Sequence, residues 1–124
     1  MRSGKLRSHE DLEVWKLARV LAADTYRMTA QLPVEERFGL QSQMRRSAVS
    51  VLSNLAEGAA RDSRADFSRF LAISMGSLAE LEVQCALCED LGFLPRNEDS
   101  LRRIRAIRIM LAGLRRALPP PIAR

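Results

Sequence analysis

The two cysteines of the chain, Cys85 and Cys88, form a CxxC pair, a spacing found in zinc sites and in redox-active dithiols. A structural zinc site needs about four ligands, and the single histidine, His9, is far from this pair in the sequence. Both cysteines continue a stripe of hydrophobic residues at helical spacing. We therefore expect two buried, reduced thiols, with no metal site and no cofactor.

Side chains that could support hydrolysis are present, but their arrangement does not favour it. A Ser-His-Asp triad would depend on His9, which lies in a polar N-terminal segment. Glu80 and Glu82 fall on opposite sides of a helix, so they do not form a close acid pair. The sequence also contains no glycine-rich phosphate-binding loop. We expect no catalytic residues, no small-molecule substrate and a protein that is not an enzyme.

A polar row follows one of the hydrophobic segments, about 60° round the helix from its apolar row. The members of the row are Gln43, Ser47, Ser50, Asn54, Glu57 and Arg61. Its position beside the core predicts a hydrogen-bonded network that fixes register between helices or between subunits, with Asn54, Glu57 and Arg61 in it. The residues expected to face it from the next segment are Ser74, Ser77 and Gln84. A ligand-binding use of the row is the alternative.

Positive charge gathers near the C-terminus. Residues 96–124 hold eight arginines against Glu98 and Asp99, a net charge of +6, whereas the whole chain carries +5. Five arginines share an arc of about 140° on the last predicted helix. They are Arg102, Arg105, Arg108, Arg115 and Arg116. Because guanidinium groups bind phosphate oxygens through paired hydrogen bonds, this face predicts contact with the backbone of RNA or DNA.

The arginine face also has a simpler interpretation, because a charged arc is usually the solvated side of a helix. The last helix has no aromatic residue on which a base could stack, so any binding would be independent of base sequence. Arg103 interrupts a neighbouring face of small residues, including Ala106 and Gly113. Another subunit could approach closely through that face.

The elements that would position these groups are helices. Apolar residues every three or four positions predict helices at about residues 10–31, 39–60, 63–91 and 98–118. The signals for their ends are Ser8 with Asp11, Pro33, Ser63 with Asp66, Gly92 and Pro119. Short connections make successive helices antiparallel neighbours, so we predict an all-α, up-down four-helix bundle. It would be a single domain over residues 1–124, with flexible tails at 1–8 and 119–124.

The composition is typical of a small helical domain. The 124 residues are 47% hydrophobic but only 5% aromatic, so the core must consist mainly of aliphatic side chains. The polar N-terminus has no apolar signal segment, and unbroken apolar runs are much shorter than the ~20 residues that cross a bilayer. We expect a cytoplasmic protein that does not enter a membrane.

Several short motifs occur in a fixed order over residues 11–94. Among them are Asp11-Leu12-Glu13-Val14-Trp15, Glu36-Arg37-Phe38-Gly39-Leu40, Arg45-Arg46-Ser47-Ala48-Val49-Ser50, Ser53-Asn54-Leu55-Ala56-Glu57-Gly58 and Gly76-Ser77-Leu78-Ala79-Glu80-Leu81-Glu82. This ordered set resembles the four-helix-bundle proteins encoded in intervening sequences of large-subunit ribosomal RNA genes. The last helix is similar to that family only in its general character.

The resemblance implies a homo-oligomer, a homopentameric ring being the suggested form, and it marks Asn54, Glu57 and Gly58 as motif residues. It also implies kinship with the accessory protein of diversity-generating retroelements, which binds reverse transcriptase and nucleic acid. The leading hypothesis is a non-enzymatic, oligomeric helical bundle, a basic scaffold that associates with nucleic acid or with a nucleic-acid-bound partner. The alternative is a self-assembling protein-interaction scaffold with no nucleic-acid role.

Overall fold

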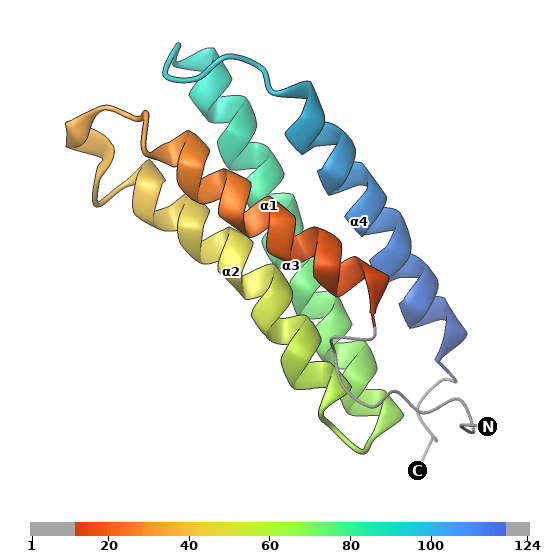
Figure 1. Cartoon of the computed structure of the whole chain (residues 1–124). Coiled ribbons are helices and arrows are strands. Elements are labelled where there is room, and N and C mark those ends of the chain that lie inside the picture. The colour runs from red at the N-terminus through yellow and green to blue at the C-terminus, as the bar shows by residue number, and fades with distance from the viewer. Residues whose placement is uncertain (1–11, 119–124) are drawn as a thin grey trace.

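The computed structural model describes residues 12–118, which form helices joined by short connections and contain no strand (Figure 1). The helices are α1 (Glu13–Thr29), η2 (a short 3-10 helix, Val34–Glu36), α2 (Leu40–Ala59), α3 (Arg64–Asp90) and α4 (Glu98–Ala117). Successive α-helices run in opposite directions in Figure 1, and each packs on the next. α4 also packs on α1, which closes the bundle. The predicted all-α four-helix bundle is confirmed.

The core lies along the common axis and receives one apolar row from each α-helix. Spacings of three and four residues place the side chains of a row on one face of a helix, which is why the pattern predicts the core. The largest fully buried apolar side chains are Leu21, Met44, Val51, Leu55, Leu71, Leu78, Leu81, Ile104, Ile107 and Leu111. Burying such a side chain contributes about 1.5–3 kcal/mol relative to leaving it in water.

The helix ends show how local sequence sets the bounds. The Ser63 hydroxyl accepts a hydrogen bond from the backbone N–H of Asp66 (3.2 Å) at the start of α3. Gly92 follows α3 with φ of +73°, a conformation that side chains with a Cβ rarely adopt. Asn97 caps α4 through the N–H of Ser100 (3.0 Å). The expected cap at Ser8, the stop at Pro119 and both expected tails lie outside the described residues.

The connection between α1 and α2 contains η2, which the apolar pattern does not predict. The carboxylate of Glu36, the last residue of η2, accepts a hydrogen bond from the N–H of Leu40 (3.2 Å), the first residue of α2. A carboxylate at this end satisfies a free N–H and also interacts favourably with the helix dipole. The turn before α2 therefore has a fixed shape.

The outward side of α3 mixes apolar and charged side chains. Its inner face buries Leu71, Leu78 and Leu81 in the core, whereas Arg69 and Glu80 share its outward side with exposed apolar residues. We call Ile73, Val83 and Leu87, which are 40%, 67% and 43% exposed, the α3 outer face. The length and composition of α3 alone would allow it to cross a membrane. The short unbroken apolar runs of the sequence instead predict that no segment does so. Exposed apolar side chains that lie together on one face of a helix often mark a surface for another protein chain.

Candidate functional site

The five arginines predicted to bind phosphate do not share one surface. Arg102, Arg105 and Arg116 are exposed on the outer side of α4. Arg108 instead extends to α3, where it forms an ion pair with Glu82. Arg115 also reaches α3, and its Nε donates a hydrogen bond to the hydroxyl of Ser68 (3.2 Å).

Ion pairs within the bundle reduce the charge that α4 offers to a partner. Besides the Arg108 pair, Arg102 is paired with Asp99 one turn earlier. Arg103 donates to Asp24 of α1 over 2.7 Å. Among the described residues, the arginines of α4 that have no carboxylate partner are Arg105, Arg115 and Arg116. Fewer arginines of α4 are therefore free to bind phosphate than the five that the sequence predicts.

An exposed apolar residue lies within the arginine arc, and sequence reasoning overlooked it. Ile109 is 70% exposed, and Met110 beside it is 37% exposed. At 100° per residue, Ile109 falls between Arg105 and Arg102 on the outer side of α4. The outer side of α4 is thus a mixed basic and apolar surface rather than a purely charged one.

The polar row of α2 forms a hydrogen-bonded seam with α3. The hydroxyls of Ser50 and Ser77 are 2.7 Å apart. Asn54 Nδ2 donates to the carbonyl (2.9 Å) and the hydroxyl (3.0 Å) of Ser50. The hydroxyl of Ser74, which is fully buried, donates to the carbonyl of Val51 (2.9 Å). These bonds satisfy polar groups next to the core and restrict sliding of α3 along α2.

Glu57 and Arg61 lie outside this seam, which differs from the sequence expectation. They form an ion pair with each other (3.0 Å), and their side chains are 52% and 44% exposed. Arg61 follows the end of α2 and lies over the ring of Phe70 on α3, 5.1 Å from its centroid, but its ion pair with Glu57 does not itself join the two helices. Such an exposed pair contributes little to folding, typically less than about 1 kcal/mol.

Gly58 has a clear packing role. A Cβ at this position would lie 2.7 Å from the Cβ of Phe70 and 3.0 Å from Cδ1 of Phe67 on α3. Both distances are shorter than ordinary carbon contacts, so the close approach of α2 and α3 at this point requires a glycine. Of the motif residues, Gly58 therefore lies against α3, Asn54 bonds to Ser50 of the seam, and Glu57 is exposed.

One atom of the predicted network stays unsatisfied in the described chain. The side chain of Gln84 is half-buried, and its Oε1 accepts no hydrogen bond from residues 12–118. It lines a shallow polar groove along the outside of the α2–α3 seam. The other residues of the groove are Gln43, Arg46, Ser47, Ser50, Ser77 and Glu80. A buried oxygen without a donor has a cost of about 1–3 kcal/mol, which a donor from outside would relieve.

The CxxC pair is packed rather than exposed for reaction. Burial, with smaller contributions from Cys88 and Glu82, raises the pKa of the Cys85 thiol to about 11. Burial and the charge of Glu36 raise the pKa of Cys88, whose thiol donates to the sulfur of Met44 (3.5 Å). Both thiols are therefore protonated at neutral pH and are poor nucleophiles. No group of three potential metal ligands occurs in the described part of the chain.

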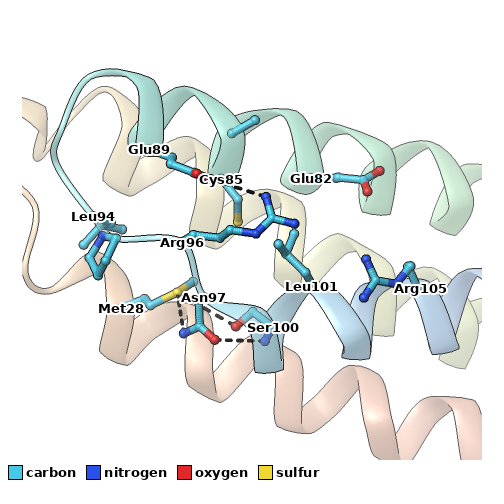
Figure 2. A pocket seen from close by; sticks show the side chains of 12 residues that line it. Met28, Glu82, Cys85, Glu89, Leu94, Arg96, Asn97, Ser100, Leu101 and Arg105 are labelled. Carbon is cyan, nitrogen blue, oxygen red and sulfur yellow. Dashed lines mark hydrogen bonds and ion pairs between the residues drawn. The ribbon is translucent and has the colours of Figure 1, made fainter.

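A cavity of about 220 Å³ lies between α3, the α3–α4 connection and α4 (Figure 2). Met28 of α1 and Cys85 line it with apolar surface, and the hydroxyl of Ser100 and the amide of Asn97 both point to the Met28 sulfur. Its charged residues are two glutamates and two arginines, Glu82, Glu89, Arg96 and Arg105. Their charges balance, so the cavity has no net attraction for an anion.

A second basic surface, which sequence reasoning missed, lies between the end of α1 and the first half of α2. Arg37, Arg45 and Arg46 surround an open groove together with Tyr26 and Phe38. No aspartate or glutamate lines this groove. Tyr26 and Arg46 are 20 positions apart and lie on two different helices, so their proximity depends on the α1–α2 turn. The one available signal was the concentration of arginine and aromatic residues around the Glu36–Leu40 motif.

Comparison with known proteins gives one clear result. The chain matches a sequence model of a family described as 23S rRNA-intervening sequence protein over residues 10–113. This range includes α1, α2, α3 and most of α4, and thus extends beyond the residues that carry the resemblance in the sequence. No curated protein matches the sequence.

Proposed function

We propose a function for this chain from the premise that it belongs to the 23S rRNA-intervening sequence protein family. That family description supports an RNA-associated role but specifies neither a surface nor an assembly. We infer a non-enzymatic, cytoplasmic scaffold that assembles into a homo-oligomer and associates with nucleic acid or with a nucleic-acid-bound partner. The kinship with the accessory protein of diversity-generating retroelements is part of this proposal.

The observation that carries the nucleic-acid part is the set of uncompensated arginines on α4. Arg105, Arg115 and Arg116 have no carboxylate partner among the described residues. Each of their guanidinium groups can form paired hydrogen bonds to a phosphate. Because α4 presents no aromatic ring, this contact is to the backbone of RNA or DNA and does not depend on base sequence.

Binding to labelled RNA duplex, measured by fluorescence anisotropy over a range of salt concentrations, tests this part. Phosphate neutralisation predicts an affinity that falls linearly with the logarithm of salt concentration. Replacing both Arg105→Glu and Arg116→Glu should weaken binding by at least about tenfold at low salt. The control, Lys16→Glu with Arg19→Glu on α1, changes the net charge equally and should have a smaller effect. Absence of binding at low salt would contradict the nucleic-acid role.

The assembly part is supported by the α3 outer face. Ile73, Val83 and Leu87 expose apolar surface on the outward side of α3, beside Arg69 and Glu80, and another protein chain would cover this surface. Symmetric association of identical chains is the commonest way to cover it, and the resemblance suggests a ring of five. The unsatisfied Oε1 of Gln84, on the same helix, adds a polar group that a second subunit could satisfy.

Sedimentation velocity tests the assembly. The unmodified protein should sediment as an oligomer, whereas Val83→Asp combined with Leu87→Asp should sediment as a folded monomer. Val20→Asp on α1 is a matched control, since Val20 is 44% exposed, close to the 43% of Leu87. A monomeric unmodified protein would refute the assembly, whatever the result for nucleic acid.

A self-assembling protein scaffold without a nucleic-acid role is the second candidate. The observation in its favour is that Arg102, Arg103 and Arg108 are already paired with carboxylates of the same chain. In this case the arginines of α4 serve packing and solubility. An oligomer that binds no RNA or DNA at low salt would support it.

A further inference from the structure

The groove between α1 and α2 combines positive charge with aromatic rings, a combination that α4 lacks. It is open to solvent, has a volume of about 620 Å³ and lies beside the turn that contains η2. Arg37, Arg45 and Arg46 contribute three positive charges, and no acidic side chain lines the groove. None of the three arginines forms an ion pair with another described residue. The groove is thus a concentrated, uncompensated positive region.

Two aromatic rings are available on this surface. Phe38 is 88% exposed and is the most exposed large apolar side chain of the described chain. Tyr26 is 44% exposed. Each ring has an arginine over one face, Arg37 at 5.6 Å from the Phe38 centroid and Arg45 at 4.5 Å from the Tyr26 centroid. A guanidinium group therefore lies over each ring, and the exposed part of each ring can receive a further flat group.

Arg45 is held in position without losing its charge. Its Nε donates to the hydroxyl of Thr29 (2.9 Å), and an Nη donates to the backbone carbonyl of Tyr26 (3.1 Å). Thr29 is fully buried, and its own hydroxyl donates to the carbonyl of Thr25 (2.7 Å). Neutral acceptors orient this guanidinium, so it loses little freedom when it binds an anion.

We propose that this groove binds single-stranded nucleic acid, with bases stacked on Phe38 and Tyr26 and phosphates bound by the three arginines. The inference rests on the proposed nucleic-acid association and adds a second surface with a preference for strands whose bases are unpaired. Stacking on aromatic side chains requires splayed bases, which a duplex does not offer. Stacked aromatic and arginine planes along a positive groove are the usual means of binding single strands without base readout.

Charge argues for nucleic acid over a second copy of this chain as the occupant. The chain carries a net charge of +5, and the groove has three arginines and no acidic residue of its own. A second copy placed on it would have to bury those arginines against a protein of the same net sign. A phosphate backbone instead supplies one negative charge per nucleotide.

Anisotropy with a fluorescein-labelled oligouridylate and with an RNA duplex provides the test, using the full-length chain. Phe38→Leu keeps an apolar side chain but removes the ring, and it should weaken binding of the single strand about tenfold. Phe38→Tyr keeps the ring and should bind like the unmodified protein. Because Phe38 is almost fully exposed, neither substitution should affect folding, which circular dichroism can verify.

The two proposals fail in different ways. Duplex binding that depends on Arg105 and Arg116, together with oligouridylate binding that is equal for Phe38→Leu and the unmodified protein, would overturn only the stacking groove. Absence of binding to either RNA would overturn both proposals. A change in sedimentation for Phe38→Leu would show that a second copy covers the groove, and this result would also overturn the stacking proposal.

Discussion

The α2–α3 interface and the contacts of α4 with its neighbours both place polar side chains beside the core, but they satisfy them by different means. Between α2 and α3 the groups are neutral, as in the Ser50–Ser77 pair and the bond from Ser74 to a backbone carbonyl. Around α4 the groups are charged, as in the ion pair between Arg103 and Asp24. The Ser74 bond is buried and the Ser50–Ser77 pair is half-buried, whereas the side chains of Arg103 and Asp24 are 25% and 34% exposed.

The two kinds of contact have different roles in this small bundle. Short hydroxyl side chains and Gly58 let α2 and α3 approach closely, so these two helices have one well-defined register. Long arginine side chains keep their charged groups near solvent while their stems cover the core. The α2–α3 seam is suited to hold the fold, and α4 is suited to present charge to a partner.

The largest expected effect concerns how well α4 shields the side of α3 that faces it. Because the pKa of Cys85 is about 11 instead of 9.0, its thiolate at pH 8 should be about a hundredfold scarcer than in the unfolded chain. Alkylation of Cys85 by iodoacetamide, followed by site-resolved mass spectrometry, should be slower in the folded protein by that factor. Similar rates in both states would mean that α4 opens readily.

The same shift affects stability at high pH. The raised pKa of Cys85 stabilises the folded state fully below about pH 9, where both states hold the proton. As the pH rises from about 9 to about 11, the unfolded chain ionises first, so this contribution is lost. Replacing Cys85→Ala should remove this part of the pH dependence.

The next effect tests close packing at the α2–α3 seam. Gly58→Ala should lower the free energy of unfolding by about 1–3 kcal/mol, because its Cβ would overlap Phe70. Gly76→Ala on α3 is the matched control, since nothing lies within 4 Å of the position that its new methyl group would occupy. The control should raise stability by about 1 kcal/mol through helix propensity. Urea unfolding that gives both variants the same sign would show that the seam is not tightly packed.

A smaller effect tests the buried hydroxyls. Ser74→Ala removes the bond to the Val51 carbonyl and should cost about 1 kcal/mol in urea unfolding, independently of salt concentration. Ser53→Ala on the exposed side of α2 should change stability by less than about 0.5 kcal/mol. Equal effects of the two substitutions would remove the distinction between the seam and an ordinary surface.

The smallest effect tests the charged contacts of α4. A double-mutant cycle with Arg103→Gln and Asp24→Asn should give a coupling of about 0.5 kcal/mol, because both side chains are partly exposed. This coupling should shrink as salt is added, unlike the effect of Ser74→Ala. A larger coupling that does not depend on salt would show that this ion pair is shielded from solvent like the hydrogen bonds between α2 and α3.

The sequence predicts the fold well because the periodicity of apolar residues contains most of the information. The same periodicity places the core rows of all four helices, and Ser63 and Gly92 mark the ends of α3. Two buried threonines of α1 escape this pattern. The hydroxyl of Thr25 donates to the carbonyl of Leu21 (2.7 Å), so the backbone of α1 satisfies this buried hydroxyl. A polar residue of this kind is not expected in the core from the apolar pattern.

The candidate sites are less predictable because they depend on contacts between distant residues. The Arg103–Asp24 pair joins residues that are 79 positions apart, and its formation decides how much charge α4 retains. A helical wheel places the arginines on α4 correctly but gives no information about acids on other helices. The groove of Tyr26, Phe38 and Arg45 likewise depends on the shape of the turn around η2, which the apolar pattern does not specify.

The α3 outer face also has a thermodynamic consequence. If subunits cover Ile73, Val83 and Leu87 in the proposed assembly, folding and association draw on the same buried surface. By mass action, the melting temperature then rises with total protein concentration, since only the folded chain associates. In that case the free energy of unfolding depends on the protein concentration, and dilution alone reduces it.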